Sequence, residues 1–326
     1  MDRQTIYHIG IVGAGAWGTA LAHSISSNGK RVTLLANDVA LANEIETKRE
    51  NSRFLPGVVL PDLIRTCSNV IELEPCNLVL LACPAQSLRS TLSSMSVRAP
   101  LLICAKGIER ESGALMTEVA AQVHPNAAVG MLSGPSFARD VALGLPCAVT
   151  IAFSDEALAT STCAAVGSLS FRPYASTDVI GVAIGGAVKN VLAIACGIVE
   201  GKGLGESARA ALTTRGFAEM ARFGVALGAK LETMSGLSGF GDLVLTASSR
   251  QSRNFSLGLD LAKGARPDRS GPLAEGAASA PALVRRAHAL GIQMPIAEAV
   301  ADIVAGRVDV DTAIRALLSR PLKSEH

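Results

Sequence analysis

The 326-residue chain has few aromatic side chains and almost no net charge. Aromatic residues make up 3% of it, and the formal net charge is +2. This balance gives no electrostatic reason to expect nucleic acid or an anionic membrane as a partner, although it leaves room for a local basic pocket that binds a small anion. Hydrophobic residues reach 49%, and with so few aromatic rings this composition is typical of closely packed helices and strands.

Cysteine and histidine show no pattern of a disulfide framework or a metal site. The seven cysteines are scattered, odd in number and without a C-x-x-C pair, so neither disulfides nor a structural zinc is indicated. The five histidines have no ligand spacing and lie outside the motifs described below. We therefore expect no metal, no histidine-based catalysis and a reducing, cytoplasmic environment.

The sequence also lacks a recognisable targeting signal. The N-terminus "MDRQTIYHIGIVGAGAWG" runs directly into a strand pattern, without the cationic segment, long apolar stretch and cleavage site of a secretory signal. One apolar run, "GVAIGGAVKNVLAIACGI" at 181–198, has the length of a membrane span, but four glycines break it and it contains Lys189 and Asn190. We expect no membrane insertion but a buried helix, in which a lysine either reaches solvent or faces a cleft.

Strand and helix patterns divide the chain in two, as its length also favours. The first half alternates short β-rich runs with helical spacing, which is typical of parallel β-α-β units. Strands are expected at 8–13, 31–36, 77–82, 100–105, 128–132, 148–153 and near 169–175, and helices near 17–28, 38–50, 85–95, 112–123 and 155–167. From about residue 178 strand signals disappear, so we expect an α/β domain over 1–177 and an all-helical domain over 178–326.

A glycine motif follows the first strand. In "GIVGAGAWGTA", Gly13, Gly15 and Gly18 form a G-x-G-x-x-G pattern that opens a helix. The first glycine permits a tight turn, the second a close approach of a pyrophosphate, and the third close helix–sheet packing. In this β-α-β context the motif favours a Rossmann-like, dinucleotide-binding domain over an ordinary glycine turn.

The end of the second strand leaves NAD and NADP open. An acidic residue there would hold a ribose 2′-hydroxyl, and a basic one a 2′-phosphate. Asn37 is neither, Asp38 lies slightly late, and Asp38 could equally be a helix N-cap.

Several polar residues follow later strands, where open α/β sheets bind ligands. Lys106 in "CAKGIE" lies just beyond a strand, although a solvated loop lysine has the same pattern. "LSGPSFARD" ends another strand through Gly134 and Ser136, and Ser136 could simply cap the helix that follows.

Two segments of the second half add polar groups in glycine-rich or turn-like surroundings. "GLSGFGDLVLT" contains Asp242, and "SSRQSRNFSLG" offers the hydroxyl, guanidinium and amide of Ser252, Arg253 and Asn254 before a predicted helix. Those donors are typical of a phosphate-binding segment. A solvated, capped turn explains them equally well.

Taken together, these motifs resemble the bacterial-type NAD(P)-dependent glycerol-3-phosphate dehydrogenase family over nearly the whole chain. The resemblance is carried, in the family's order and spacing, by "GAGAWGTALA", "NSRFLPGVVLP", "AKGIE", "LSGPSFARDVALGLP", "DVIGVAIGGAVKNVLAIACGI", "ARAALTTRGFAEM", "GLSGFGDLVLT", "SRNFSLG" and "LAEG". It implies a Rossmann-like N-terminal domain, an all-helical C-terminal domain, and interconversion of dihydroxyacetone phosphate and sn-glycerol 3-phosphate with NAD or NADP. It also implies a homodimer and a role in glycerophospholipid synthesis.

The resemblance assigns roles to individual positions. Lys189 matches the family's catalytic lysine, with Lys106 and Asp242 beside it at the reacting end. A buried lysine has a lowered pKa, which makes proton exchange feasible near neutrality. The implied cofactor contacts are Gly13, Gly15, Ala16, Trp17, Gly18, Asn37, Lys106, Ala138, Arg253, Leu273 and Glu275. The implied substrate contacts are Lys106, Gly134, Ser136, Lys189, Asp242, Ser252, Arg253 and Asn254.

Two positions depart from the family pattern. Family members often carry Arg or His where this chain has Asn37, which leaves its preference between NAD and NADP open. They commonly have Asn where this chain has Ser207, and we expect altered local hydrogen bonding there with activity kept.

Two other functions fit part of this pattern. A hydroxyacid dehydrogenase of the same lysine–asparagine type would share the fold, but a carboxylate substrate would not need the donors at 252–254. A non-catalytic nucleotide sensor would bind the cofactor without turnover, and it would have little use for both lysines and Asp242.

Overall fold

The computed structural model describes residues 6–321 except residue 97 and residues 266–273. Its first half forms one eight-stranded sheet in the order β3-β2-β1-β4-β5-β6-β7-β8. The strands are β1 (His8–Val12), β2 (Arg31–Leu35), β3 (Ile64–Cys67), β4 (Leu78–Leu81), β5 (Leu101–Ile103), β6 (Val129–Ser133), β7 (Cys147–Ala152) and β8 (Phe171–Ser176). Strands β1 to β6 are parallel and extend to both sides of β1, as in doubly wound dinucleotide-binding folds.

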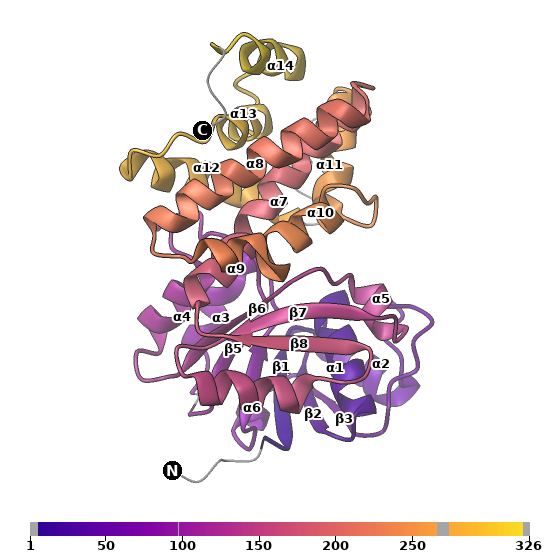
Figure 1. Cartoon of the computed structure of the whole chain (residues 1–326). Coiled ribbons are helices and arrows are strands. Elements are labelled where there is room, and N and C mark those ends of the chain that lie inside the picture. The colour runs from indigo at the N-terminus through magenta and orange to yellow at the C-terminus, as the bar shows by residue number, and fades with distance from the viewer. Residues whose placement is uncertain (1–5, 97, 266–273, 322–326) are drawn as a thin grey trace.

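Short helices connect these strands and cover both faces of the sheet (Figure 1). They are α1 (Ala16–Ser27), α2 (Val39–Lys48), α3 (Leu88–Ser93), α4 (Met116–Val123), α5 (Ala138–Ala142) and α6 (Glu156–Val166), with 3-10 turns η1 (Val70–Leu73) and η2 (Ala85–Ser87). Two buried hydrophobic clusters lie against the sheet. One packs around α1 and α6, and the other continues without interruption into the helices of the second half.

Two features of the sheet differ from the sequence prediction. Strand β3 was not predicted, because it has four residues and includes the exposed Arg65, so its pattern is weak. β7 runs antiparallel to β6 instead of parallel. The five-residue α5 between them is about 7 Å long and cannot span a strand of about 20 Å, so the chain turns back directly.

The second half of the described chain is helical and stacks on one side of the sheet (Figure 1). Its elements are α7 (Val179–Gly201), α8 (Glu206–Ala226), α9 (Leu231–Ser235), the π-turn η3 (Leu237–Gly241), α10 (Asp242–Thr246), α11 (Arg253–Ala262), α12 (Glu275–Ala289), α13 (Pro295–Val304) and α14 (Val310–Leu318). The predicted fold class, a Rossmann-like sheet followed by helices, is confirmed.

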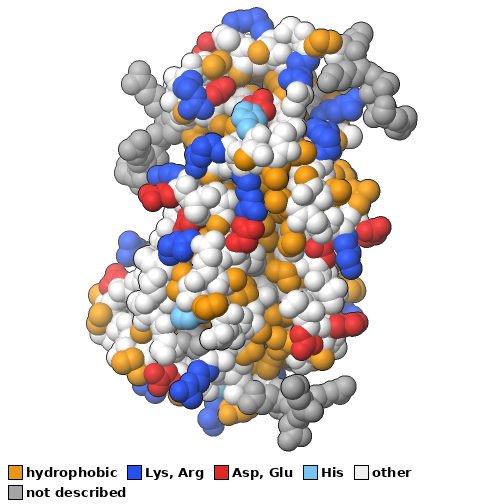
Figure 2. All heavy atoms as spheres, turned by 90° about the vertical axis from the view of Figure 1, so that its left-hand side faces the viewer, with side chains coloured by type: hydrophobic (Ala, Val, Ile, Leu, Met, Phe, Trp, Pro, Cys, Tyr) orange, Lys and Arg blue, Asp and Glu red, His pale blue; other side chains and the backbone are white. Residues whose placement is uncertain are grey.

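Helix α7 is the centre of this helical half. Among the described residues it is the one helix long and apolar enough to cross a membrane, but 89% of its apolar window is buried inside the protein. Every residue from Gly181 to Val199 is buried, as predicted for a core helix. Outside, positive and negative side chains are interspersed, and Figure 2 shows both signs across one face.

Candidate functional site

The glycine turn after β1 leaves an open space at the start of α1. Gly13 has φ +108°, and a Cβ on it would lie 2.9 Å from the backbone nitrogen of Cys83. A Cβ on Gly18 would lie 1.9 Å from the Gly13 carbonyl oxygen, whereas one on Gly15 would meet nothing within 4 Å. Gly15 is also the N-cap of α1 and provides no side-chain cap. The uncapped helix terminus beside free space therefore fits a dinucleotide pyrophosphate.

Four other predicted cofactor positions lie in the sheet half, at the start of α1, after β2 and at the start of α5. Ala16 and Trp17 begin α1, Asn37 is exposed after β2, and Ala138 begins α5, which packs against α1. The carboxyl oxygen Oδ1 of Asp38 accepts hydrogen bonds from the backbone amides of Ala40 and Leu41, so Asp38 is the N-cap of α2.

Glu275 joins the helical half to the sheet half. At the start of α12, its Oε1 accepts a 3.0 Å hydrogen bond from the backbone amide of Ala85, while its buried Oε2 has no partner among the described residues. Burial raises the pKa of Glu275, opposed by the Ala85 amide and by Arg253. Leu273, the other cofactor position of this segment, lies outside the described residues.

A buried cluster of two lysines and one aspartate lies between the sheet and the helices. Lys189 Nζ on α7 donates to Asp242 Oδ1 at 2.9 Å and to Thr246 Oγ1 at 2.7 Å. Lys106 lies just after β5, and its Nζ donates to Asp242 Oδ2 at 2.6 Å and to the Gly134 carbonyl at 3.3 Å. One carboxylate therefore binds both ammonium groups, which come from segments far apart in the sequence.

The pKa values of Lys189 and Asp242 are both lowered in this cluster. Burial lowers the pKa of Lys189 to about 8, because the loss of hydration outweighs the attraction of Asp242, and Lys106 lowers it further. Burial alone would raise the pKa of Asp242, but the two lysines outweigh it and hold it below its usual value. Near neutral pH, Asp242 is thus ionised while Lys189 can both give and take a proton.

The segment after β6 approaches the same cluster. Gly134 has φ +146°, and a Cβ there would lie 2.7 Å from the Val149 Cα, so a side chain could not be accommodated without a backbone shift. Ser133 Oγ donates to Asp242 Oδ2 at 3.4 Å. Ser136 Oγ donates to the Gly134 carbonyl at 3.0 Å. This turn is therefore held against both Lys106 and Asp242.

The donors of residues 252–254 are only partly free. Ser252 caps α11 by accepting from the Phe255 amide at 3.2 Å, which confirms a capping role. The Asn254 amide is buried and donates to Asn190 Oδ1 at 2.9 Å. Arg253 is exposed, and its positive charge contributes to lowering the pKa of Lys189. Arg253 is the member of the three with most freedom to bind an anion.

Two residues of the cluster were not predicted. Thr246 accepts from Lys189, and it lies one helical turn after Asp242. Asn190 donates to the Lys106 carbonyl at 3.4 Å and accepts from Asn254. The sequence carried a signal for each. Thr246 stands four residues after Asp242, on the same helix face, and Asn190 is a polar residue next to Lys189 in an apolar helix.

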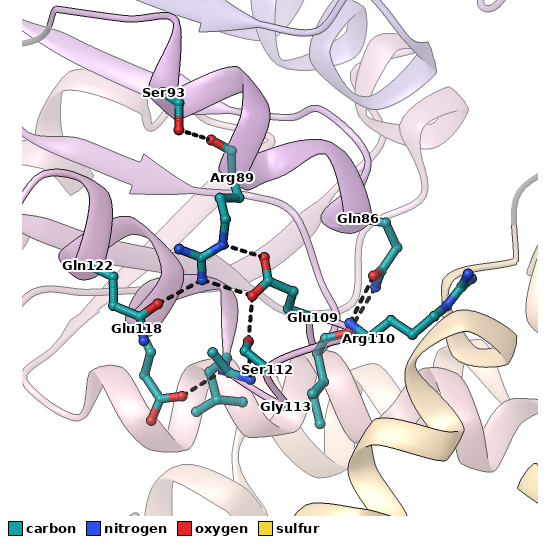
Figure 3. A network of polar contacts seen from close by, with 12 residues as sticks. Gln86, Arg89, Ser93, Glu109, Arg110, Ser112, Gly113, Glu118 and Gln122 are labelled. Atoms are coloured by element: carbon teal, nitrogen blue, oxygen red, sulfur yellow. Dashed lines mark hydrogen bonds and ion pairs between the residues drawn. The ribbon is translucent and has the colours of Figure 1, made fainter.

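A polar network fastens the loop that follows Lys106. Arg89 on α3 donates to both oxygens of Glu109 at 2.8 Å and to Gln122 at 2.7 Å, and Gln86 accepts from the Arg110 amide (Figure 3). This fixes the loop on its outer side.

Within the described residues, no group of three or more His, Cys, Asp or Glu side chains could hold a metal ion.

A doubly wound sheet with an open glycine turn, and a buried lysine–carboxylate cluster at its edge, define a dinucleotide-dependent oxidoreductase. Comparison with known proteins gives the family. Residues 8–159 match the model of the NAD-dependent glycerol-3-phosphate dehydrogenase N-terminus, and residues 178–315 match that of the C-terminus. The chain belongs to the NAD-dependent glycerol-3-phosphate dehydrogenase family.

Individual relatives agree over almost their whole length. The chain is 54% identical to a glycerol-3-phosphate dehydrogenase [NAD(P)+] of Rhodospirillum rubrum, covering 99% of this chain and 95% of the relative. It is 51% identical to that of Caulobacter vibrioides, covering 99% and 100%. The crystal structure of glycerol-3-phosphate dehydrogenase from Coxiella burnetii superimposes with a TM-score of 0.92 at 33% identity, covering 97% and 100%.

Proposed function

We propose that the chain catalyses reversible hydride transfer between NAD(P)H and dihydroxyacetone phosphate, giving sn-glycerol 3-phosphate, with Lys189 as proton donor and acceptor. The observation that carries the proton role is the buried ammonium of Lys189, held by Asp242 and Thr246, with its pKa lowered to about 8. A group that titrates close to the working pH is suited to general acid–base catalysis.

The residues of the cluster have separable tasks. When bound, the nicotinamide cofactor supplies or accepts the hydride at the substrate carbon. In reduction, the Lys189 ammonium stabilises the negative charge that develops on the carbonyl oxygen and donates its proton there. In oxidation, the neutral amine takes the hydroxyl proton. Asp242 stays ionised and orients Lys189, while Lys106 adds positive charge beside the substrate.

The remaining site residues would bind and orient the two ligands. Gly13 and Gly18 shape the tight turn and Gly15 leaves space for the cofactor pyrophosphate. The other proposed cofactor positions are Ala16, Trp17, Asn37, Lys106, Ala138, Arg253, Leu273 and Glu275. Gly134, Ser136 and residues 252–254 would hold the substrate, with Arg253 as the principal phosphate ligand. Binding the phosphate at a fixed distance from Lys189 would align the carbonyl group for reaction.

The reaction is tested by the loss of NADH or NADPH absorbance on mixing purified protein with dihydroxyacetone phosphate. We expect oxidation that depends on this substrate, together with little turnover of 2-oxoacids that lack a phosphate. No oxidation with either cofactor by folded protein, or equal turnover of an unphosphorylated 2-oxoacid, would contradict the proposed reaction.

The resemblance also supports proposals about the whole protein. We propose a cofactor domain over 1–177 and a substrate domain over 178–326, a homodimer in the cytoplasm, and a supply of sn-glycerol 3-phosphate for glycerophospholipid synthesis. Sedimentation equilibrium of the purified chain tests the dimer, because a monomer and a dimer differ twofold in mass.

A further inference from the structure

The segment Asn51–Leu55 lies against the glycine turn that follows β1, near the carboxyl end of β2. The Asn51 side chain is fully buried and donates to the Ala14 carbonyl at 2.9 Å and to Thr19 Oγ1 at 2.8 Å. Its own carboxamide oxygen accepts from the Phe54 amide at 3.2 Å. Asn51 therefore fixes residues 51–54 beside the cofactor turn, 37 residues away in sequence from Ala14.

This anchoring holds a positive charge near the end of β2. The Arg53 guanidinium lies over the Phe54 ring, 5.0 Å from its centroid, and 3.6 Å from Asp38 Oδ2. Its side chain is 64% exposed, so its donors are accessible. Asn37, the neighbouring residue at the strand end, carries no charge. In this fold class the ribose 2′ position lies near the end of the second strand.

Asp38 would favour the ribose 2′-hydroxyl of NAD, and Arg53 would favour the 2′-phosphate of NADP. Their contacts show which of the two side chains is free to bind. Asp38 Oδ1 is occupied by two backbone amides of α2, and Oδ2 faces Arg53. The 3.6 Å separation from Arg53 exceeds a good hydrogen bond, and an ion pair this exposed is weak. The guanidinium fork can therefore turn from Asp38 to a phosphate at little cost, and its planar donors match phosphate oxygens.

We propose that Arg53 recognises the 2′-phosphate of NADP, so that this chain accepts the phosphorylated cofactor despite the neutral Asn37. The proposal rests on the proposed function in that it requires the cofactor to bind at the glycine turn. It assigns to Arg53 the specificity for a single group of the cofactor, and to Asp38 an opposing charge that limits that specificity.

The test compares two nucleotides that differ only by the 2′-phosphate. Isothermal titration calorimetry of the full chain would measure Kd for 2′,5′-ADP and for 5′-AMP. We expect Arg53→Ala to weaken 2′,5′-ADP binding about tenfold, the scale of one charge-assisted contact, and to change 5′-AMP binding less than about twofold. Arg31→Ala is the matched control, because Arg31 is exposed at the opposite end of β2, and it should change neither value.

A second variant should strengthen the binding of 2′,5′-ADP instead of weakening it. Asp38→Asn keeps an amide oxygen for the α2 cap but removes the charge that competes for Arg53. We expect it to tighten 2′,5′-ADP binding several-fold and to leave 5′-AMP binding nearly unchanged. Equal losses for both nucleotides in Arg53→Ala, or no effect of either variant on the 2′-phosphate difference, would overturn the role of Arg53.

The outcomes also separate this proposal from the proposed function. If Arg53 has no role, the chain still oxidises NADH with dihydroxyacetone phosphate, and only the 2′-phosphate proposal fails. If wild-type protein binds neither nucleotide and oxidises neither cofactor, both proposals fail together.

Discussion

At the scale of single residues, the Lys189 ammonium stands in an environment that opposes its charge. The side chain is 10% exposed, and burial is the largest influence on its pKa, with Asp242 acting against it. An unpaired buried lysine would be costly. Asp242 reduces that cost, and Thr246 supplies a second acceptor, so the amine can exist in either protonation state within one structure.

Replacing Lys189 by alanine should abolish most of the activity and retain the fold. We expect kcat to fall at least roughly a hundredfold, because general acid–base catalysis contributes on this scale. Steady-state rates with dihydroxyacetone phosphate, with circular dichroism as the check on folding, measure this. Lys202→Ala is the control, because Lys202 follows the same helix and pairs with Asp311 instead. Near-normal turnover in folded Lys189→Ala would exclude Lys189 as the acid–base group.

The two reaction directions should depend on pH in opposite ways. With the pKa of Lys189 lowered to about 8, the ammonium needed for reduction is lost as pH rises through that value. The neutral amine needed for oxidation appears over the same range. We expect kcat/KM for reduction to fall, and that for oxidation to rise, around pH 8. Profiles that move in the same direction in both assays would assign the titration to another group.

At the scale of elements, the site depends on how closely α7 and α11 cross. A Cβ on Gly197 would lie 2.1 Å from the Phe255 carbonyl oxygen, and one on Gly258 would lie 2.2 Å from that of Ile194. These two glycines allow backbone contact between the helices. Because α11 begins at Arg253, this close approach sets the distance between Lys189 and the proposed phosphate-binding residues.

Gly197→Ala should therefore push α11 away from α7. We expect a loss of about 1–3 kcal/mol in the free energy of unfolding, as for overpacking in a core, and a higher KM for dihydroxyacetone phosphate. Urea unfolding and steady-state kinetics measure the two effects. Gly236→Ala is the control, since an added Cβ there meets no atom closer than 3.4 Å. A stable variant with unchanged KM would show that the helix contact does not set the site geometry.

At the scale of the whole molecule, contacts between the two halves hold the lysines together. Lys106 comes from the sheet half and Lys189 from α7, and Asp242 binds both. On the outer side, Arg286 of α12 donates to both oxygens of Glu118 on α4, at 2.5 and 2.7 Å, and to the Gly113 carbonyl. These bonds tie the helical half to the loop that follows Lys106.

Removing this outer tie should give a pH-dependent loss of stability. Burial alone would raise the pKa of Glu118, but Arg286 and the Leu115 amide lower it overall. The pKa of Glu118 in the folded protein lies below its unfolded value of about 4.5. Its ionised form therefore stabilises the fold above pH 4.5, and this contribution is lost as the pH falls through the folded-state pKa. We expect Arg286→Ala to cost about 1 kcal/mol at pH 7, since both side chains are partly exposed.

Unfolding in urea at pH 7 and at pH 3.5 gives the free energies of unfolding of wild type and Arg286→Ala. The difference between the two proteins should be smaller at pH 3.5. Arg307→Ala is the control, because Arg307 pairs locally with the exposed Asp302 inside the helical half. A difference that is the same at both pH values would mean that Arg286 acts through packing and not through its charge.

Short spacings in the sequence were enough to predict several features of the fold. The glycine pattern 13, 15 and 18 predicted the turn and the open helix terminus. A Cβ would meet backbone atoms at Gly13 and Gly18, whereas Gly15 borders open space. The apolar run around Lys189 predicted a buried helix, because its hydrophobic surface has no other stable place in water. Most strands of the sheet and the change to helices near residue 178 followed from the same local periodicities.

Which distant groups meet depends on how the complete fold packs. Asp242 binds one lysine 53 residues away and another 136 residues away, and no local pattern encodes such a distance. The packing also engaged Asn254 with Asn190, 64 residues away, and placed β7 antiparallel to β6. The physical reason is that periodicity records which side of an element faces the core, whereas the packing of complete elements determines which side chains share a buried space.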